Sequence, residues 1–422
     1  MLAAEYDPAV AHGTLRWRWY EGLTVIELVN NWEFGCFEET YSSDRINAQL
    51  RHVLDATSPD VVHVHNLLNL SFDLPRIASE RGIGVVATLH DYTLVCPSGG
   101  QRVHVSESHV CETIDSERCA RCFHESPLSL QMRAGSVSRA RGGGLPVRVG
   151  RMVHRLAPAL ARSAVRSIAG PAVSASDIRR RLAYAKQVFE TVDLFVAPSA
   201  SMAAEFEKLG IPSDRIQVSD YGFRPLTDLT AAEAIPGGSL RIGFVGTLVW
   251  HKGVHVLIDA IRGLRGQFEV LIHGDTNVFP DYVAALRKAA ADAPVTFAGG
   301  FDRDRTAAVY STFDVLVVPS LWPENSPLVI HEAFMRGVPI VGARVGGIPE
   351  LVHDGSNGLL YPPFSVESLR SSLQRLIDDR PFLDSLKRYR ASVKTIHDDA
   401  QEWKSRYQSV CRREPDGVRA YS

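Results

Sequence analysis

Short runs of apolar, often β-branched residues alternate with longer stretches of helical periodicity along most of this 422-residue chain. This order is typical of parallel βαβ units, in which helices cover both faces of a sheet. We therefore predict an α/β fold built from parallel units rather than from hairpins. The runs predicted as strands are 24–28, 60–65, 84–90 and 193–199 in the first half, and 240–246, 268–274, 295–300, 314–320 and 339–344 in the second.

The length of the chain divides these units between two domains, because one ordinary core serves roughly 150 to 220 residues. We predict two doubly wound, Rossmann-like domains that face a cleft. Residues 1–222 are assigned to the first domain, 223–238 with their prolines and glycines to a linker, and 239–391 to the second domain. Residues 392–422 are expected to form a C-terminal helix and tail, which could pack on either domain, including back on the first.

Composition excludes several classes of function. The chain is 45% apolar and 22% charged with a net charge of -2, so it lacks the overall positive charge that is typical of a nucleic-acid binder. No run reaches the roughly 18 apolar residues of a membrane span, and the first ten residues lack the pattern of a signal peptide. We therefore expect a cytoplasmic protein that meets any charged partner locally.

Residues 133–186 are locally very basic, since eleven arginines and Lys186 are accompanied by a single acidic residue, Asp177. Two interpretations stay open. The stretch could be a solvated helical face or a poorly ordered insertion. It could instead contact anionic lipid head groups at the inner face of the plasma membrane, where each basic residue contributes about 1 kcal/mol. An RNA-binding role is disfavoured because aromatic residues are scarce between the arginines.

The segment 314–363 carries the strongest chemical signal. A strand is followed by a polar loop, and a helix begins near Pro327, where the missing N–H of proline costs nothing. Such a step places free backbone N–H groups at the carboxyl edge of a parallel sheet, where α/β proteins hold phosphates. Glu324 on the loop and Glu332 on the helix, with seven residues between them, bracket that position. Carboxylates accept hydrogen bonds from sugar hydroxyls, although two ordinary solvent-facing glutamates would also explain an isolated pair.

The pair is not isolated, because it continues into RGVPIVGARVGGIPELV (336–352) and DGSNGLLYPP (354–363). The whole segment resembles the retaining glycosyltransferases of family four, which have the GT-B fold. The resemblance implies that Glu324 is a catalytic residue in contact with the donor sugar and that Glu332 binds the ribose hydroxyls of a nucleotide. The other loop residues that would bind the donor are Asn325, Ser326, Pro327 and Leu328.

Upstream, RIGFVGTLVWHKGVHVLIDAI (241–261) resembles the element that opens the nucleotide-binding domain of this family. By that resemblance Lys252 would pair with the donor diphosphate, beside Gly246 and Thr247. Many relatives carry an arginine in this loop, whereas this chain has Thr247 directly after Gly246, so a hydroxyl group would replace one cation. Taken alone, Lys252 would be an ordinary surface lysine.

Two predicted strands of the first half end in histidine. His90, followed by Asp91, resembles the acceptor-domain histidine that lies near the anomeric carbon in this family, so we predict a catalytic role for it. His63 and His65 are assigned a strand-end or core role. The resemblance extends from about residue 23 to residue 410.

Residues 1–20 contain no glycine-rich loop. Members of the family begin with a strand, such a loop and a helix, whereas this chain starts near what would be the third strand. We therefore expect the first domain to be incomplete in this sequence and the natural protein to carry further N-terminal residues.

Cys96, Cys111, Cys119 and Cys122 form the pattern C-x14-C-x7-C-x2-C, whose last pair has a spacing common among zinc ligands. Further candidate ligands nearby are His104, His109 and His124. Structural zinc and free thiols both stay open, because the outer spacings match no standard zinc finger.

Together these features predict an enzyme that moves a sugar from a nucleoside diphosphate donor to a glycan or lipid-linked acceptor in cell-envelope or exopolysaccharide synthesis. Lys252 and a helix N-terminus would meet the charge of the leaving diphosphate, so catalysis would need no cofactor. Retention of configuration follows from the resemblance alone. The alternatives are a non-catalytic or truncated protein of the same fold and a nucleotide-sugar epimerase, and the donor base stays open.

Overall fold

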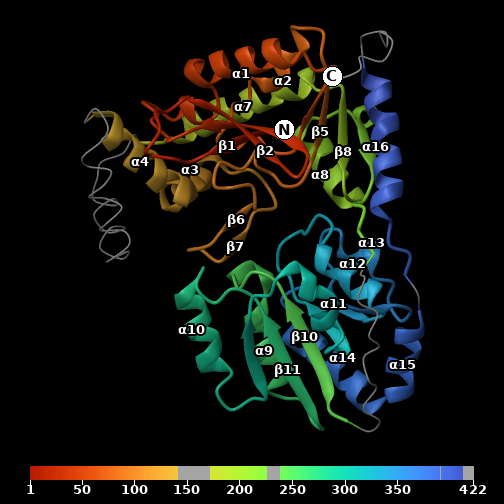
Figure 1. The fold of residues 1–422 in the computed structure, drawn as a ribbon. Helices are drawn as coiled ribbons and strands as arrows, with labels where there is room; N and C mark the ends of the chain where they lie inside the picture. Colours follow the sequence, from red (N-terminus) through yellow and green to blue (C-terminus); the bar gives the residue numbers. More distant parts are fainter. Residues whose placement is uncertain (141–171, 226–237, 390, 412–422) are drawn as a thin grey trace.

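The computed structural model describes residues 1–140, 172–225, 238–389 and 391–411. The described chain forms two α/β halves, which lie one above the other in Figure 1. Helix α16 (Ile396–Val410) returns from the second half and runs along the side of the first. Most of the linker predicted at 223–238 and of the basic stretch predicted at 133–186 lies outside the described residues.

The first half is built on a sheet of four parallel strands in the order β4-β5-β8-β9. The strands are β4 (Val61–Val64), β5 (Gly84–Thr88), β8 (Leu194–Ala197) and β9 (Ile216–Val218). The two central strands, β5 and β8, are buried along their whole length, as continuous apolar runs in a parallel sheet should be. The helices of this sheet are α1 (Asp44–Thr57), α2 (Leu74–Ser79), α7 (Ala175–Thr191) and α8 (Ala200–Leu209).

A separate three-stranded sheet precedes it, in the order β1-β3-β2. Its strands are β1 (Leu2–Glu5), β2 (Leu15–Tyr20) and β3 (Leu23–Val29). The prediction of a strand at 24–28 is confirmed, but the expectation of parallel units rather than hairpins is wrong here, because β2 and β3 are antiparallel. Glu21 and Gly22 both have positive φ, as the tight turns of hairpins require. Most of β2 is exposed, so its sequence lacks the apolar run that marks a buried strand.

A second hairpin, β6 (Val103–His104) and β7 (His109–Val110), extends from the first half toward the second (Figure 1). It is followed by α3 (Ser116–Glu125) and α4 (Pro127–Ala140). Val110 packs against the apolar cores of both halves, and so does Trp250 of the second half. Apolar side chains therefore bridge the two cores.

The second half contains six parallel strands in the order β12-β11-β10-β13-β14-β15. They are β10 (Leu240–Val245), β11 (Phe268–His273), β12 (Val295–Gly299), β13 (Val315–Val318), β14 (Ile340–Ala343) and β15 (Gly358–Tyr361). The five strands predicted here are confirmed, and β15 is additional. The helices are α9 (Val254–Ile261), α10 (Pro280–Ala289), α11 (Thr306–Tyr310), α12 (Leu328–Met335), α13 (Ile348–Leu351), α14 (Val366–Asp378) and α15 (Arg380–Arg388). The strand order reverses between β10 and β13, and α/β sheets bind ligands at the carboxyl ends of such neighbours.

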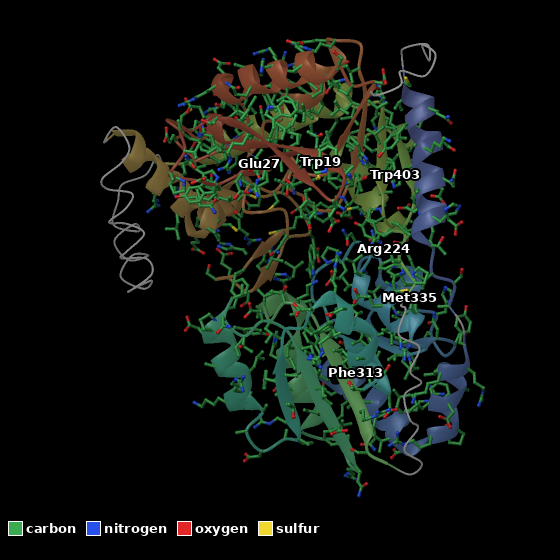
Figure 2. The ribbon with its side chains drawn as sticks, viewed as in Figure 1. Trp19, Glu27, Arg224, Phe313, Met335 and Trp403 are labelled. Atoms are coloured by element: carbon green, nitrogen blue, oxygen red, sulfur yellow. The ribbon has the colours of Figure 1, made fainter. Side chains whose placement is uncertain are left out.

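Helix α16 packs against the sheet of the first half. Trp403, Tyr407 and Val410 lie against a small apolar cluster on β5 and β8, and Figure 2 shows Trp403 on the side of α16 that faces this half. The approach is close enough to require glycine at position 84, because a Cβ there would lie 2.2 Å from the carbonyl oxygen of Val410. The C-terminal helix thus belongs to the packing of the first half.

His63 lies at this contact. One ring nitrogen, Nδ1, is 2.8 Å from the hydroxyl of Tyr407, and Nε2 is 2.8 Å from the hydroxyl of Thr88. The ring also lies 4.4 Å from that of Trp403. Burial lowers the pKa of His63 to about 3, with a further contribution from neighbouring histidines when they are charged. His63 is therefore neutral at physiological pH.

Acidification should weaken the fold through this histidine. Because the folded pKa lies below the ordinary value of about 6.5, the unfolded chain binds more protons as pH falls from about 6.5 toward 3, and stability is lost across that window. We predict that the free energy of unfolding, measured in urea, decreases between pH 7 and pH 5, and that His63→Gln makes this decrease smaller. The exposed His397 provides the control: His397→Gln should leave the decrease as in the wild type. A decrease of the same size in His63→Gln would contradict the prediction.

Candidate functional site

An ion pair between Lys252 and Glu324 lies at the carboxyl ends of β10 and β13. The carboxylate of Glu324 is only 5% exposed, and its Oε1 accepts hydrogen bonds from Nζ of Lys252 at 2.6 Å and from the hydroxyl of Ser320 at 2.5 Å. The ammonium group of Lys252 also lies 5.4 Å from the centre of the Trp322 ring. Removing one partner from a buried ion pair costs about 3 to 5 kcal/mol, so this contact fixes the two segments to each other.

The residues after Glu324 join this loop to the first half of the molecule. Asn325 donates a hydrogen bond from Nδ2 to the backbone carbonyl of His90, with a distance of 2.5 Å. The hydroxyl of Ser326 donates to a carboxylate oxygen of Asp220 at 2.7 Å. His331, on α12, lies 3.0 Å from the same hydroxyl. The predicted donor-binding loop and the predicted catalytic histidine are therefore in direct contact.

Two glycines, Gly253 and Gly346, allow other parts of the backbone to pack closely against the segment from Pro319 to Glu324. Gly253 has φ +73° at the start of α9, and a Cβ there would lie 1.8 Å from the carbonyl oxygen of Pro319. Gly346 has φ +58°, and its Cβ would lie 2.3 Å from the carbonyl oxygen of Glu324, to which the N–H of Gly347 donates at 2.7 Å. The close approach of backbone to backbone explains why the sequence carries glycine at these places.

Helix α12 begins at Leu328, next to Pro327 as predicted. No side chain of the described residues caps this end. The N–H of Ile330 donates to the carbonyl oxygen of Pro327 at 3.0 Å, so an anion would meet the N–H groups of Leu328 and Val329 and the positive end of the helix dipole. The N–H of Ser326, in contrast, donates to Oδ1 of its neighbour Asn325 at 2.6 Å. Among the loop residues predicted to bind the donor, Leu328 therefore offers a backbone N–H within the uncapped turn.

Gly246 and Thr247 lie directly after β10, six and five residues before Lys252 in the chain. Thr247 is exposed. Its side chain is therefore accessible at the carboxyl end of β10, the end of the strand at which Lys252 and Glu324 meet.

Glu332, on α12, is placed by a contact that sequence reasoning did not find. Its Oε2 accepts a hydrogen bond from the hydroxyl of Tyr310 at 2.7 Å, and Tyr310 itself is fully buried. Burial raises the pKa of Glu332, while the hydrogen bond from Tyr310 and the charge of Arg303 oppose that rise. Tyr310 thus fixes the orientation of this carboxylate.

His90 follows β5, and both of its ring nitrogens have partners. Nδ1 lies 3.0 Å from the hydroxyl of Tyr221, and Nε2 lies 2.8 Å from Nδ1 of His65. Burial, together with the charge of His65, lowers the pKa of His90 to about 4, so its ring is neutral at physiological pH. Tyr221 and Asp220 were not singled out in the sequence, because only the fold brings the chain after β9 to this edge.

Glu350 adds a further contact between the halves that the sequence did not indicate. Its carboxylate, on α13, accepts hydrogen bonds from the backbone N–H groups of Ala200 and Ser201, each at 2.7 Å. Ala200 and Ser201 are the first two residues of α8, and the N-terminus of a helix favours a negative charge next to it. The sheets of both halves therefore present their carboxyl ends to one shared region.

The four cysteines 96, 111, 119 and 122 are free and partly buried. Burial raises the pKa of Cys119 to about 12, and the other three thiols contribute in the same direction. Within the described residues, no three side chains of metal-binding type are grouped so that they could hold an ion. Structural zinc stays a prediction.

None of the described helices is long and apolar enough to cross a membrane.

Residues 239–379 match the family described as glycosyl transferases group 1. The matched range begins just before β10 and ends just after α14, so it contains the six-stranded sheet, Lys252 and the loop of Glu324. Residues 239–379 are a glycosyl transferases group 1 domain.

Relatives that carry the names of glycosyltransferases match about half of the chain. A D-inositol 3-phosphate glycosyltransferase of Corynebacterium aurimucosum is 31% identical over 216 residues, which cover 46% of this chain and 51% of that protein. A 2-deoxystreptamine glucosyltransferase of Streptomyces kanamyceticus is 29% identical over 244 residues, covering 55% of this chain and 57% of that protein. The chain thus spans about half the length of the relatives it matches.

The solved structures extend the likeness to both halves. Anabaena Alr3699/HepE in complex with UDP has a TM-score of 0.59 at 17% identity, covering 91% of this chain and 86% of that one. The catalytic domain of starch synthase IV from Arabidopsis thaliana, bound to ADP and acarbose, has a TM-score of 0.57 at 14% identity, covering 94% and 85%. The group 1 domain therefore forms part of a GT-B fold, as the sequence predicts.

Two glycines of the group 1 domain allow a matched test of the close approach between Gly253, the neighbour of Lys252, and the carbonyl oxygen of Pro319. Gly253 and Gly299 have similar φ, +73° and +77°, so alanine at either position costs about 1 to 2 kcal/mol. Only Gly253 faces a backbone oxygen at 1.8 Å, whereas no described atom lies within 4 Å of a Cβ at Gly299. We predict that Gly253→Ala lowers the free energy of unfolding by at least about 2 kcal/mol more than Gly299→Ala, because of the added overpacking. Chemical denaturation measures both, and equal losses would show that the close approach is unimportant.

Proposed function

We propose that this protein is a glycosyltransferase that moves a sugar from a nucleoside diphosphate sugar to an acceptor hydroxyl. The main support is the meeting of Lys252, the buried Glu324 and the uncapped N-terminus of α12 within a group 1 domain. A cation and a free helix N-terminus at the carboxyl edge of a parallel sheet suit a diphosphate. The geometry therefore supports a donor site better than a purely structural ion pair.

In the proposed reaction the bond between the anomeric carbon and the diphosphate breaks, and the acceptor oxygen forms the new bond to that carbon. Negative charge develops on the leaving diphosphate. Nζ of Lys252 would turn from Glu324 to this charge, and the first N–H groups of α12 would stabilise it further. The proton of the acceptor hydroxyl would pass to a diphosphate oxygen, on the same face of the sugar. Retention of configuration is part of the proposal.

The two glutamates would bind different parts of the donor. Glu324, released from Lys252 but still bonded to Ser320, would accept hydrogen bonds from the transferred sugar. Glu332 would bind the ribose hydroxyls with a carboxylate that Tyr310 has already oriented. The neutral His90, held by Tyr221 and His65, would present its backbone carbonyl and ring next to the anomeric carbon.

The donor base and the acceptor are left open within this proposal. One structural neighbour is bound to UDP and another to ADP, so we propose a nucleoside diphosphate sugar without assigning its base. A glycan or lipid-linked acceptor in envelope or exopolysaccharide synthesis remains the expected class. Contact of the stretch 133–186 with an anionic membrane surface stays a prediction.

The proposal is tested by incubating the purified protein with UDP-, GDP- and ADP-linked sugars and measuring release of the nucleoside diphosphate. We predict turnover of at least one donor and a loss of about 100-fold or more in kcat for Lys252→Ala, as for other groups that stabilise developing charge. Lys252→Arg keeps a cation beside Glu324 and should retain more activity. The exposed Lys288 of α10 provides the matched control, and Lys288→Ala should behave as the wild type.

Circular dichroism of Lys252→Ala separates loss of activity from loss of the fold, because this substitution leaves Glu324 buried without its cation. Binding of a nucleotide sugar without turnover by the wild type would favour the non-catalytic alternative. Interconversion of the free donor without release of diphosphate would favour an epimerase.

A further inference from the structure

Helix α12 carries a buried histidine among apolar residues. His331 is 4% exposed, and the other buried residues of the helix are Ile330 and Ala333. A buried imidazole is costly unless its polar atoms have hydrogen-bond partners. His331 has its partners outside the helix, in the loop before α12 and in the first half of the molecule.

Three side chains, those of Asp220, Ser326 and His331, form a closed polar cluster. Nε2 of His331 lies 3.0 Å from the hydroxyl oxygen of Ser326 and 3.2 Å from Oδ2 of Asp220. The hydroxyl of Ser326 donates its only proton to Oδ1 of Asp220 at 2.7 Å. The oxygen of Ser326 can therefore only accept from His331, so the imidazole carries a proton on Nε2 and donates it to both partners.

His331 also contacts the place where the chain crosses between the halves. Its ring stacks on that of Phe223, with 4.6 Å between the ring centres. Phe223 lies in the crossing segment that follows β9, and it pairs with the second crossing segment, which leads into α16. The N–H of Phe223 donates to the carbonyl of Lys394 at 2.9 Å, and the N–H of Ile396 donates to the carbonyl of Phe223 at 2.8 Å. Figure 2 shows Arg224, the next residue, at the boundary between the halves.

The two crossing segments are closely packed. A Cβ at position 222 would lie 2.4 Å from the Cβ of Asp399 and 2.8 Å from the carbonyl oxygen of Thr395, so only glycine fits there. Lys394 forms ion pairs with Asp399 at 2.8 Å and with Glu402 at 3.1 Å. The segments therefore form one connection, and a side chain bonded to this connection is held in a fixed place.

The polar cluster joins this connection to the donor loop and to α12. Ser326 follows Asn325, which is bonded to the backbone carbonyl of His90, and it precedes the uncapped start of α12. His331 directly precedes Glu332 in the chain. The helix that carries Glu332 is thus tied to the segment through which the first half is attached.

Stability alone does not call for such a cluster. The carboxylate of Asp220 is 31% exposed, so water could satisfy it, and leucine at position 331 could pack on Phe223 without a polar partner. Replacing buried polar partners by apolar groups of similar shape is often close to neutral for stability. The apolar version would lose direction, because hydrogen bonds restrict the angle between two segments far more than apolar contacts do.

We propose that His331 and Asp220 are positioning residues for the proposed transfer and that they act through Ser326. They hold the first half, with its His90, at the distance from the donor site at which an acceptor oxygen reaches the anomeric carbon. Neither residue touches the substrate. Their effect on turnover rests on the proposed function, whereas the connection between α12 and the crossing segments does not.

Donor turnover by His331→Leu tests this role. We predict a kcat at least about tenfold below that of the wild type, because a displacement of about 1 Å costs about 100-fold. KM for the donor and Kd for the nucleoside diphosphate should stay within about threefold, since the groups that bind the donor are unchanged. His331→Gln keeps an N–H near the position of Nε2 and should recover most of kcat. His353→Leu, at an exposed position of the same half, is the control and should behave as the wild type.

The separation of kcat from KM decides the outcome. Weaker donor binding with kcat unchanged would show that His331 contacts the donor, and unchanged values of both would show that it positions nothing. Either result overturns the proposal. A Gln variant as slow as the Leu variant would also do so, because the hydrogen bond would then not be the cause.

A second substitution tests whether the cluster acts as one unit. Asp220→Ala should lower kcat as His331→Leu does, and the double variant should be no slower than the slower single variant, because both substitutions break the same cluster. Losses that multiply would contradict this.

Hydrogen exchange tests the connection without any donor. The amides of residues 219–224 and 394–397 should exchange at least about tenfold faster in His331→Leu than in the wild type, and at the wild-type rate in His353→Leu. Circular dichroism checks that each variant is folded. If the wild type turns over no donor, the proposed function fails while faster exchange still supports the connection. Turnover by the wild type with unchanged exchange in His331→Leu would leave the glycosyltransferase and remove His331 as the link.

Discussion

A carboxylate that is 5% exposed needs a partner, and for Glu324 that partner is Lys252. The rest of the site depends on this ion pair. It fixes the loop before α12 to the segment before α9, two segments that follow neighbouring strands where the strand order reverses. Because the charge of each residue offsets that of the other, the pair holds a cation beside the N-terminus of α12. In the proposed reaction the diphosphate of the donor takes the place of Glu324 at this cation.

The same loop also connects the two halves of the molecule. Glu324 contacts the second half, while the next two residues contact His90 and Asp220 of the first. Glu350 with the start of α8 and the return of α16 to β5 add further contacts. The loop, rather than either sheet, therefore sets the position of the predicted catalytic histidine relative to the donor site. Any motion that separates the halves at this loop would have to break the hydrogen bonds made by Asn325, Ser326 and Glu350.

The sequence could predict what depends on local pattern. Strands β10, β13 and β14 are buried on both faces, so each is a continuous apolar run that can be recognised as a strand from its residues alone. Strand β2 was missed because its apolar residues Leu15, Trp17 and Trp19 alternate with polar ones, whereas the predicted strands were found from continuous apolar runs. The start of α12 could be placed because proline marks it.

Contacts between distant residues could not be predicted in the same way. Lys252 and Glu324 were both candidates, but they are 72 residues apart, and nothing in the chain showed that they touch. Tyr310 and Tyr221 had no motif at all, since their contacts depend on which helices and loops meet in space. The resemblance to a family supplied roles for single residues, while only the fold shows which of them restrain one another.

The central claim is that Lys252 exchanges Glu324 for the diphosphate of a bound donor. A crystal structure with an intact nucleoside diphosphate sugar tests it most directly. The account predicts a diphosphate oxygen within hydrogen-bond distance of Nζ of Lys252, a second at the N-terminus of α12, and the transferred sugar bonded to Glu324. A nucleotide bound elsewhere, or bound here with the pair between Lys252 and Glu324 still intact at 2.6 Å, would contradict it.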